Sequence, residues 1–518
     1  MSEVTTQRAD EDAVSGIDPA ELAVALKVLA QVDALDPEHP DAVAVRRATA
    51  RVWKSVKARR RSDRRRAVSE ADAAVFAATA TAAPGRIDDE TAGIPLASAA
   101  AGAVAGTLLR ARSCYMCKQR YTVVDAFHHN LCPSCATSNR SHRDARADLT
   151  GRRALLTGGR AKIGMYIALR LLRDGAHTTI TTRFPHDAVR RFSAVPDSAD
   201  WLHRLRVVGL DLRDPAQVAA LADDVAAQGP LDVLINNAAQ TVRRAAGSYA
   251  ALVEAEQEPL PADTVPEVLV FSHASDAHPA ALAGAVPALG AVVATEEGSA
   301  VGVPSAADPA GVPIAGTPAE RLAALAMTAR SASPERIAAG LAVDAGGLLP
   351  DTATVNSWVA NVEGVDPLEL LEVQLCNQTA PFILISRLRA MLAAGAARAA
   401  SQRSYVVNVS AMEGVFGRGY KAPGHPHTNM AKAALNMLTR TSAQEMFDED
   451  RILMTAVDTG WITDERPHHT KLRLAEEGFH APLDLADGAA RVYDPVVRGE
   501  RGEDLYGVFL KDFHVSSW

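Results

Sequence analysis

The sequence predicts an α/β fold with a doubly wound parallel sheet over residues 151–518, and two observations support this. From residue 151 onward, short β-branched runs alternate with helical stretches, which is typical of βαβ units and a parallel sheet. The first of these runs, 153–156, leads into a glycine-containing turn that a helix follows. Since 518 residues are too many for one ordinary core, we expect further units ahead of the sheet.

Composition sets limits on the class of protein. A net charge of −8 with 48% hydrophobic residues fits a soluble globular chain and gives no general case for nucleic-acid or membrane binding. The N-terminal stretch MSEVTTQRADED is polar and acidic, unlike a secretory signal. The longest apolar stretches, 94–109 and 280–295, are shorter than the roughly 20 residues that span a bilayer. We therefore expect a cytoplasmic protein with no membrane segment.

Three regions follow one another along the chain. We expect a helical region over 1–110, a four-cysteine module over 111–140 and the α/β domain over 151–518. In the first region, residues 18–33 have the apolar spacing of an amphipathic helix behind an Asp cap, and a second helix is expected from Pro40 to about residue 79.

The second predicted helix carries a strongly basic run, residues 46–66. Such a run is most simply a solvated face, but a protein or nucleic-acid partner that binds through residues 46–140 is an open alternative. The run lacks the interleaved aromatic side chains expected of single-strand binders. Residues 80–110 are rich in Ala and Gly, and their sequence fits either a linker or a helix.

Four of the five cysteines lie in two CxxC pairs, Cys114 with Cys117 and Cys132 with Cys135. Two such pairs at this separation supply four thiolates for a tetrahedral, closed, structural zinc site. A redox dithiol pair is the alternative. His128 and His129 are expected to support the site or to lie on the surface. The fifth cysteine, Cys376, is expected in the core.

The turn after the first strand is a candidate dinucleotide site. Residues 157–164, TGGRAKIG, connect strand and helix, so backbone amides and the helix dipole can hold a pyrophosphate. A simple strand–helix turn is the alternative. The second strand ends at Arg183, where an acidic residue would bind an unphosphorylated ribose. An Arg at that position favours the 2′-phosphate of NADP.

Further motifs follow in a fixed order. Asp211 and Leu212 end the third strand, Asn237 and Ala238 follow the fourth, and Asp458-Thr459-Gly460-Trp461-Ile462-Thr463 ends the sixth. With the turn, this order resembles the short-chain dehydrogenase/reductase superfamily, whose motifs are TGxxxGIG, D-[VL], NNAG, an Asn-bearing helix, YxxxK and PG-x-x-T. The resemblance covers about 151–241 and 365–518. It implies a Rossmann-type fold and NADP(H)-dependent hydride transfer.

The resemblance also implies roles for particular residues. Gly158 and Gly164 would line the pyrophosphate turn, Asp211 would touch the adenine, Asn237 would sit behind the ribose, and Thr463 would hold the nicotinamide carboxamide. The full set expected to bind the cofactor is Thr157, Gly158, Arg160, Lys162, Ile163, Gly164, Arg183, Asp211, Leu212, Asn237, Ala238, Lys432, Gly460 and Thr463.

Lys162 departs from the pattern, because it stands where the superfamily has its middle glycine. Its side chain must turn away from the backbone path, and it would then reach a phosphate. Arg160 lies in the same turn. Both cations favour NADP over NAD. The alternative is that Lys162 is simply solvated and that nucleotide binding is weakened.

The catalytic positions depart further from the pattern. Lys432 and Asn377 match the superfamily's Lys and Asn, but Thr428 stands four residues before Lys432, where the superfamily has its proton-donating Tyr. Ala411 takes the usual Ser position, and Ser410 lies one residue early. We expect catalysis to involve Asn377, Ser410, Thr428 and Lys432 with a non-standard proton donor. The replacement acids nearby are Glu413, Tyr420, His425 and His427.

Residues 242–356 interrupt the alternation of strands and helices, with one clear strand at 267–271. This insertion falls near the substrate cleft at the carboxyl ends of the strands. A lid, an oligomer contact and a partly disordered loop all fit its composition. Residues 276–318 have low complexity and are expected to be the least ordered part.

The sequence thus favours an NADP(H)-dependent oxidoreductase that acts on an unidentified carbonyl or alcohol substrate. A catalytically degenerate scaffold or sensor, which binds a nucleotide and a partner, is the alternative, and a nucleic-acid-binding protein led by residues 46–140 is the third. The resemblance further implies a homo-oligomer that pairs through the helices bearing Asn377 and Lys432.

Overall fold

The computed structural model describes most of the chain. The described residues are 16–84, 86, 96–244, 246–261, 266–279, 347–348, 353–462 and 465–518. The chain divides into two compact units, Met1–Ala73 and Ala74–Trp518. The cysteine module and the sheet belong to the same unit.

The first unit is helical, as its sequence predicts. Helix α1, Pro19–Val32, begins behind Asp18, whose Oδ1 accepts hydrogen bonds from the backbone N of Ala20 at 2.7 Å and of Glu21 at 3.2 Å. These bonds satisfy donors that the first turn leaves unpaired. Helix α2, Pro40–Ala77, contains the whole basic run and continues into the second unit. Both predicted helices are therefore confirmed.

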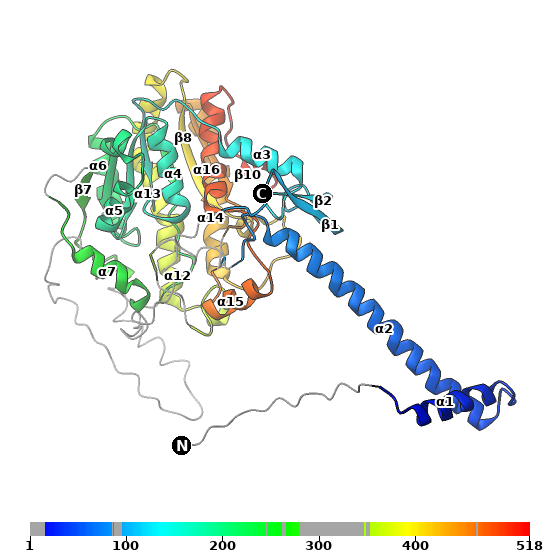
Figure 1. Cartoon of the computed structure of the whole chain (residues 1–518). Helices are drawn as coiled ribbons and strands as arrows, with labels where there is room; N and C mark the ends of the chain where they lie inside the picture. Colours follow the sequence, from blue (N-terminus) through cyan, green and yellow to red (C-terminus); the bar gives the residue numbers. More distant parts are fainter. Residues whose placement is uncertain are drawn as a thin grey trace, which may run out of the picture. The chain divides into compact units, whose positions relative to one another are not determined.

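The second unit contains one large sheet (Figure 1). Among the described residues the sheet has nine strands in the order β11-β10-β9-β8-β6-β3-β4-β5-β7. All neighbours pair in parallel except β10 and β11, which form an antiparallel hairpin. The strands are β3 Arg153–Leu156, β4 His177–Thr182, β5 Leu205–Gly209, β6 Val233–Asn236, β7 Glu267–Val270, β8 Ser404–Ser410, β9 Ile452–Asp458, β10 Phe509–Lys511 and β11 His514–Ser516.

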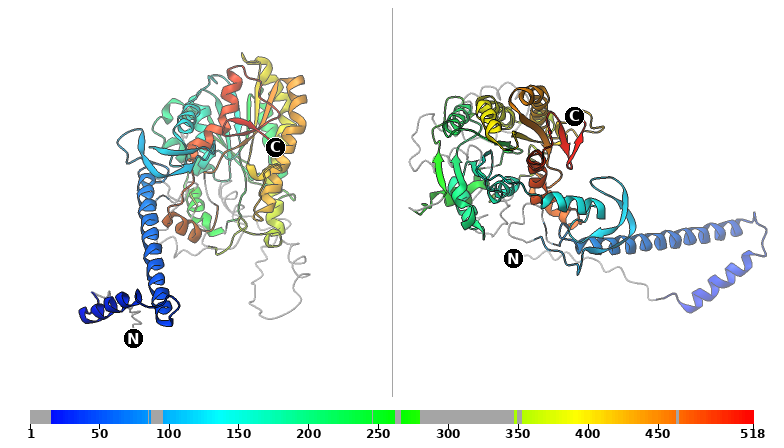
Figure 2. Two further views of the ribbon diagram at one scale, coloured as in Figure 1. Left: turned by 90° about the vertical axis from the view of Figure 1, so that its right-hand side faces the viewer. Right: turned by 90° about the horizontal axis from the view of Figure 1, so that it is seen from above.

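Helices cover both faces of this sheet (Figure 2). One apolar core joins the sheet to α4 Lys162–Arg173, α5 Pro185–Ser193 and α16 Leu485–Glu500. A second core, on the other face, joins it to α6 Pro215–Ala227, α13 Ala380–Arg398 and α14 Pro426–Asp450. This is the predicted Rossmann-type, doubly wound arrangement.

The strand order reverses between β3 and β6. From β3 the chain builds outward through β4 and β5, then returns to β6 and builds the other way through β8 and β9. In open α/β sheets, ligands bind in the crevice at such a switch point, beyond the carboxyl ends of the strands. The turns that follow β3 and β6 therefore define the expected site.

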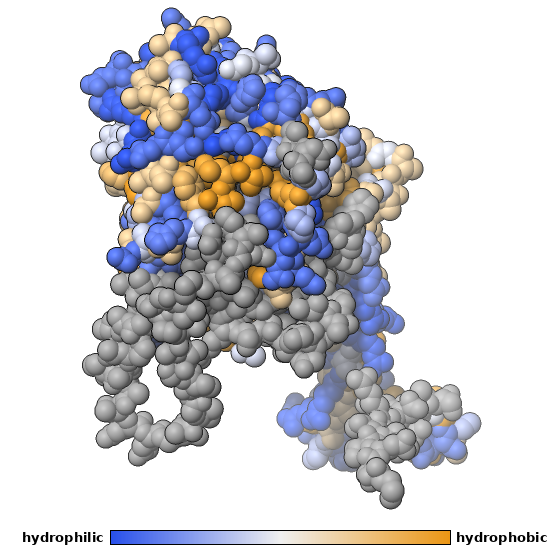
Figure 3. All heavy atoms as spheres, turned by 90° about the vertical axis from the view of Figure 1, so that its left-hand side faces the viewer, coloured by the Kyte–Doolittle hydropathy of each residue, from blue (hydrophilic) through white to orange (hydrophobic). Residues whose placement is uncertain are grey.

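The insertion contributes structure to the edge of the sheet, although most of it, including nearly all of 276–318, lies outside the described residues. Strand β7 pairs in parallel with β5 and confirms the strand predicted at 267–271. Helix α7, Ala250–Gln257, packs against α5. Figure 3 views the side of the molecule on which β7 lies, and apolar side chains gather there in a band.

The cysteine module is a small α+β unit. Strands β1 Val104–Ser113 and β2 Arg120–Asp125 pair antiparallel, and helix α3, Pro133–Arg143, follows. The segment 80–110 is therefore neither wholly linker nor helix, because its last residues form β1. The pairing of β1 with β2 explains this, since the partner strand lies beyond the segment.

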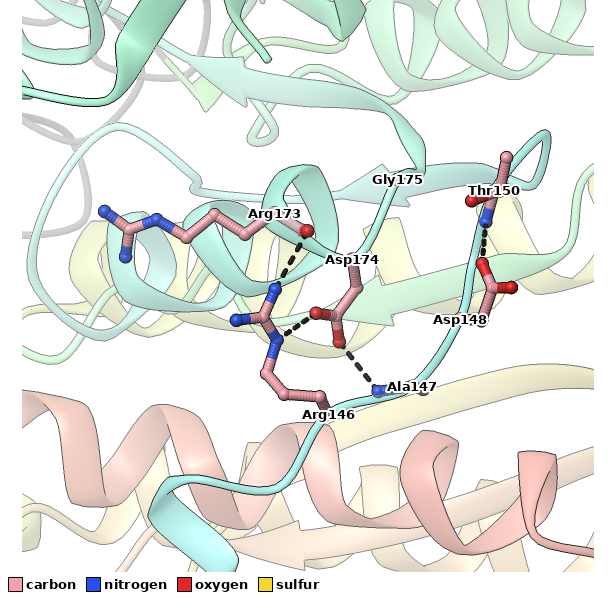
Figure 4. A pocket seen from close by; sticks show the side chains of 7 residues that line it. All are labelled: Arg146, Ala147, Asp148, Thr150, Arg173, Asp174 and Gly175. Atoms are coloured by element: carbon pink, nitrogen blue, oxygen red, sulfur yellow. Dashed lines mark hydrogen bonds and ion pairs between the residues drawn. The ribbon is translucent and has the colours of Figure 1, made fainter. Parts of the chain in front are cut away.

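A linker leads from α3 to the sheet and lines a shallow hollow at the amino end of β4 (Figure 4). Arg146 forms an ion pair with Asp174, and the Ala147 N donates to Asp174 Oδ2 at 2.9 Å. The Tyr493 hydroxyl donates to the same oxygen at 2.5 Å. These bonds to Asp174 hold the linker in place. The hollow lies at the end of the sheet opposite the switch point.

Among the described residues, the segment Pro367–Arg398 is long and apolar enough to cross a membrane. It comprises α12, Pro367–Gln374, one π-helical turn, η6 Leu375–Thr379, and α13. Ala380, Leu384, Leu388 and Leu392 lie in the core between the helices and the sheet. The apolar character of this segment is therefore accounted for by burial against the sheet.

Candidate functional site

The turn after β3 leaves no room for side chains at its glycines. A Cβ on Gly164 would lie 2.0 Å from the Gly158 carbonyl oxygen, and one on Gly159 would lie 2.5 Å from Ile180 Cγ2. Gly158 has a φ of +70°, which favours glycine. The bare backbone of this turn and the amino end of α4 together form a surface suited to a pyrophosphate.

Asn237 and Thr157 join this turn to the end of β6. Asn237 Nδ2 donates to the carbonyl oxygens of Thr157 and Gly158, both at 3.1 Å. Thr157 Oγ1 accepts from the backbone N of Asn237 and of Ala238, also at 3.1 Å. Sequence reasoning placed these residues in one site, and the structure brings them together at the switch point.

Lys162 is the first residue of α4 and has a φ of +52°. This left-handed backbone conformation is unfavourable for a lysine and readily adopted by a glycine, the residue that the superfamily has at this position. Its Nζ lies 3.8 Å from Glu465 Oε1. Ile163, the next residue, packs against Ile462 and Leu483 rather than pointing to solvent.

The guanidinium groups of Arg160 and Arg183 both lie near the ring of Phe184, and that of Arg160 is 5.4 Å from the ring centre. The Arg160 guanidinium forms an ion pair with Asp187 of α5. The Arg183 guanidinium lies 5.3 Å from the ring centre of Tyr249 and 5.9 Å from that of Phe184. Both arginines thus cluster beyond β4, where the 2′-phosphate of NADP is expected.

The insertion reaches the same place through Glu256. The Glu256 carboxylate is buried and accepts hydrogen bonds from the backbone N of His186 at 3.0 Å and of Asp187 at 2.7 Å. These amides belong to the first turn of α5, so the carboxylate occupies the positive end of that helix. Nothing in the local sequence indicated this long-range cap.

Asp211 is buried and paired, in contrast to the expectation that it touches the adenine. Its carboxylate forms an ion pair with Arg213 at 2.6 Å and lies 3.1 Å from His278 Nε2. Burial alone would raise its pKa, but the charge of Arg213 and the bond to His278 lower it well below the usual range. Leu212 is half-buried against the core on the α6 face. His278 belongs to the insertion and could not be assigned from sequence.

Asn377 lies in the π-helical turn η6 and is buried. Its Oδ1 accepts from the backbone N of Gln240 at 2.7 Å, and its Nδ2 donates to the Gln240 carbonyl at 2.9 Å. Single π-turns are frequent at functional sites because they redirect one side chain out of the helical register. Here the turn directs Asn377 onto the backbone that leads from β6 into the insertion.

Lys432 reaches the carboxyl end of β8. Its Nζ donates to the Val409 carbonyl oxygen at 2.7 Å. Gly414 permits this approach, since a Cβ there would lie 2.9 Å from Lys432 Cβ. Burial lowers the pKa of Lys432 to about 8, against the opposing effects of Cys376 and Glu413. An ammonium with this pKa exchanges protons near neutral pH.

The two hydroxyls expected to take part in catalysis are occupied by other groups. Ser410 Oγ donates to Asn436 Oδ1 at 2.6 Å, and Thr428 Oγ1 donates to the His425 carbonyl oxygen at 2.9 Å. Both side chains are buried. Thr428 thus stabilises the first turn of α14.

Three of the replacement acids are positioned as follows. Tyr420 is 73% exposed on the loop between β8 and α14. Glu413 pairs with Arg418 at 2.8 Å. His427 is buried, and its Nε2 lies 3.9 Å from Glu369 Oε1. Burial, together with the charge of His425, lowers the pKa of His427.

His425, the fourth, caps α14 with a left-handed φ of +44°. Its ring stacks on Trp358 with a centroid distance of 4.1 Å, and its Nδ1 lies 2.8 Å from the Trp358 carbonyl oxygen. Trp358 follows the insertion along the chain. The segment directly after the insertion therefore packs against the start of α14.

Asp458 is a site residue that sequence reasoning treated only as the end of a strand. It pairs with Ser410 in the register of β8 and β9, and its Oδ1 accepts from the Met412 N at 3.3 Å. Burial, together with the charges of Glu413 and Asp512, raises the pKa of Asp458 to about 6. Of the loop that follows, Gly460 has a φ of +80° and Thr463 lies outside the described residues.

The four cysteines of the two CxxC pairs come together. Their Sγ atoms all lie within 4.8 Å of one another, and Cys117 Sγ and Cys132 Sγ are 3.8 Å apart. Four thiolates about 2.3 Å from one tetrahedral ion have a similar mutual spacing. The donor set and its geometry therefore fit a bound Zn²⁺.

The two histidines beside this cluster are buried and make their own bonds. His128 Nε2 lies 2.9 Å from Asp487 Oδ2, and His129 Nδ1 lies 2.8 Å from Thr81 Oγ1. Burial lowers the pKa of His129 to about 3. Neither residue lies on the surface. Cys376 is buried, as expected.

Comparisons with known proteins agree with this architecture. Residues 152–256 match the family model described as short chain dehydrogenase. The chain is 28% identical over 401 residues to an uncharacterized protein of Acanthamoeba polyphaga mimivirus, covering 74% of this chain and 71% of that protein. It is 40% identical to a probable oxidoreductase of Streptomyces antibioticus over 18% of this chain, and this match spans only 30% of that protein.

The solved structures that match this chain include a Pseudomonas aeruginosa RhlG/NADP active-site complex. It is 18% identical, with a TM-score of 0.39 over 70% of this chain and 95% of that chain. An NADPH-bound carbonyl reductase from chicken fatty liver is 17% identical, with a TM-score of 0.40 over 73% of this chain and 98% of that chain.

Proposed function

Since the chain belongs to the short-chain dehydrogenase/reductase superfamily through residues 152–256, we propose that it is an NADP(H)-dependent oxidoreductase. Its substrate is a carbonyl compound or the corresponding alcohol. The observation that carries the proposal is the turn after β3, where a Cβ on Gly164 would lie 2.0 Å from the Gly158 carbonyl oxygen. A bare backbone turn this close to the start of the following helix is suited to a pyrophosphate.

NADP(H) fits the residues around this turn. The backbone of Gly158 and Gly164 would hold the pyrophosphate, and Asn237 would fix the turn from behind. Arg183, with Arg160 and Lys162 nearby, would face the 2′-phosphate, since no acidic residue ends β4. When bound, the cofactor supplies the hydride.

The protein itself must supply the proton, and we assign this role to Lys432. Its Nζ lies at the end of β8, and a pKa near 8 allows it to donate a proton to a carbonyl oxygen and recover one from water. Asn377 fixes the backbone at Gln240 from the facing helix. Ser410 and Thr428 take supporting roles in holding α14.

The second candidate function is a nucleotide-binding scaffold without turnover. The bonds of Thr428 to His425 and of Ser410 to Asn436 favour it, because both hydroxyls donate their protons to groups of the protein itself. Lys432 separates the two candidates. A scaffold has no use for a half-buried lysine at the end of β8, whereas an enzyme without the usual Tyr needs one proton donor.

We further propose that the cysteine cluster holds one structural Zn²⁺. Cys114, Cys117, Cys132 and Cys135 fill all four positions, so such an ion would stabilise the module without taking part in hydride transfer. A cytoplasmic location and pairing of two copies through the helices bearing Asn377 and Lys432 remain predictions. So does a partner at residues 46–140.

Turnover tests the proposed function. We expect the full-length, zinc-replete protein to oxidise NADPH with at least one member of a panel of aldehydes, ketones and quinones, followed by absorbance at 340 nm. The Lys432→Met variant should lose at least about 100-fold in kcat, the scale of an absent general acid. A protein that binds NADPH but turns over no member of the panel would favour the scaffold instead.

A further inference from the structure

The cysteine module reaches the segment that follows β9 through Tyr115. This tyrosine lies inside the first CxxC pair, between Cys114 and Cys117. Its hydroxyl oxygen accepts a hydrogen bond from the Trp461 backbone N at 2.9 Å. Trp461 belongs to the run 459–463, which corresponds to the loop that superfamily members set against the nicotinamide.

The conformation of this loop leaves space for the tyrosine. Gly460 has a φ of +80°, and a Cβ there would lie 3.5 Å from the Tyr115 hydroxyl and 2.6 Å from Leu483 Cδ1. The loop, the tyrosine and Leu483 are therefore packed in contact, with no room for a side chain between them.

Apolar packing extends the contact to both sides of the expected cofactor cleft. Ile462 from the loop and Ile163 from the first turn of α4 pack in one cluster with Cys114 and Leu131 of the module. A Cβ on Gly488 would lie 2.2 Å from Ile462 Cδ1. The module thus touches the loop after β9 and the helix that begins at the pyrophosphate turn.

A buried polar network fixes the module in this position. His128, Asn139 and Arg143 all bond to Asp487, at 2.9, 2.7 and 2.9 Å. Arg143 also bonds to Asp484 at 2.6 Å. Asp484 and Asp487 begin α16, directly after the segment that follows β9. Figure 1 shows α3 of the module beside α16.

We propose that the cysteine module forms a wall of the cofactor site, and that Tyr115 is a positioning residue for residues 459–462, the described part of the loop after β9. A metal held by the four cysteines would fix the backbone that carries Tyr115, and Tyr115 would in turn fix the loop that is expected to meet the nicotinamide half of NADP(H). This inference rests on the proposed function. It adds that metal binding at the cysteines strengthens binding of the nicotinamide half but leaves the adenosine half unaffected.

The test compares two ligands on the full-length, zinc-replete protein. NADPH carries both halves of the cofactor, whereas adenosine 2′,5′-bisphosphate carries only the adenosine half. For Tyr115→Phe we expect the Kd for NADPH to rise about 3- to 10-fold, the effect of one lost hydrogen bond. The Kd for adenosine 2′,5′-bisphosphate should stay within about twofold of the wild-type value.

Tyr121→Phe is the matched control. Tyr121 lies in the same module, and its hydroxyl donates to the His129 carbonyl oxygen at 2.6 Å, a bond wholly within the module. We expect it to leave the Kd of both ligands unchanged. Metal removal from the wild type by a chelator is the second measurement, and it should raise the Kd for NADPH at least as much as Tyr115→Phe does.

Other outcomes would overturn the inference. An unchanged NADPH affinity in both Tyr115→Phe and the metal-free protein would show that the module does not support the loop. An equal loss for both ligands would indicate general unfolding instead of a nicotinamide-specific effect. A wild-type protein that binds neither ligand would contradict the proposed function itself, and the inference with it.

Discussion

His128 Nε2 lies 2.9 Å from Asp487 Oδ2, and neither side chain has any exposed surface. Burial and the hydrogen bond to His128 have opposite effects on the pKa of Asp487. Burial would raise its pKa, but His128 and the charge of Arg143 lower it well below the usual range. A charge pair this deep is stabilising only while both partners are present. It joins the cysteine module to the helix that follows the candidate cofactor loop.

Loss of Asp487 should therefore destabilise the protein strongly. We expect Asp487→Ala to lower the free energy of unfolding by about 3–5 kcal/mol, because His128 and Arg143 would lose their buried partner. Denaturant unfolding measures this change. Asp144→Ala, at an exposed carboxylate at the end of α3, is the control and should change stability by less than about 0.5 kcal/mol. Equal effects of the two substitutions would contradict the role of this pair.

The pH dependence of reduction should report Lys432. With its pKa near 8, the ammonium form is lost as pH rises. We expect kcat for carbonyl reduction to be level below about pH 7 and to fall about tenfold per pH unit well above 8. Lys432→Arg should lose the activity and, with it, the fall of kcat above pH 8, since a guanidinium does not release its proton. Lys421→Met, at another lysine with a lowered pKa, should retain the fall of kcat above pH 8. If the fall of kcat at alkaline pH shifted in Lys421→Met, it would report Lys421 and not Lys432.

Asp458 by itself should contribute less to the free energy of unfolding at neutral pH than at acid pH. The pKa of Asp458 in the folded protein, about 6, lies above the ordinary value of 3.8. The stabilising contribution of its protonated form to the free energy of unfolding is therefore fully present below about pH 4 and is lost as pH rises through 6. Asp458→Asn should raise the free energy of unfolding at pH 8 by up to about 3 kcal/mol, since each pKa unit corresponds to about 1.4 kcal/mol. At pH 3.5 the variant and wild type should be equal. Denaturant unfolding at both pH values measures this difference. The same gain in the free energy of unfolding at pH 8 and pH 3.5 would show that titration of Asp458 is not its cause.

The metal content should depend on the clustered cysteines alone. We expect about one Zn²⁺ per chain in the wild type and a large loss in Cys135→Ser, because a structural site needs all four ligands. Cys376→Ser is the matched control, since Cys376 is buried but lies outside the cluster. Elemental analysis of the purified proteins measures both. Full zinc retention in Cys135→Ser would contradict the four-cysteine site.

The sequence predicted much of the sheet, because strands such as β8 and β9 are buried throughout and contain several β-branched residues. Strand β9 occupies residues 452–458, the run that the sequence indicated. Strand β1 was not predicted, since its Ala- and Gly-rich start becomes a strand only by pairing with β2. The glycine turn and the four cysteines were identified because each is a local pattern with a fixed spacing.

Contacts between distant segments could not be predicted. Glu256 caps α5 and His278 meets Asp211, and both come from an insertion whose composition gives no register. Tyr115 looked like an ordinary residue between two cysteines, and its bond to Trp461 joins positions 346 residues apart. The hydroxyls of Ser410 and Thr428 matched catalytic positions in sequence, but nearby polar groups of α14 accept their hydrogen bonds.

Parallel fluorescence titrations of the zinc-replete protein with NADPH and NADH test the central claim most directly. The account predicts saturable, micromolar binding that favours NADPH and is lost in Arg183→Glu, because that substitution reverses the charge beside Tyr249, where the 2′-phosphate is expected. Equal binding of both nucleotides would retain the fold but contradict the preference for NADP. Absence of saturable binding for either would contradict the oxidoreductase assignment.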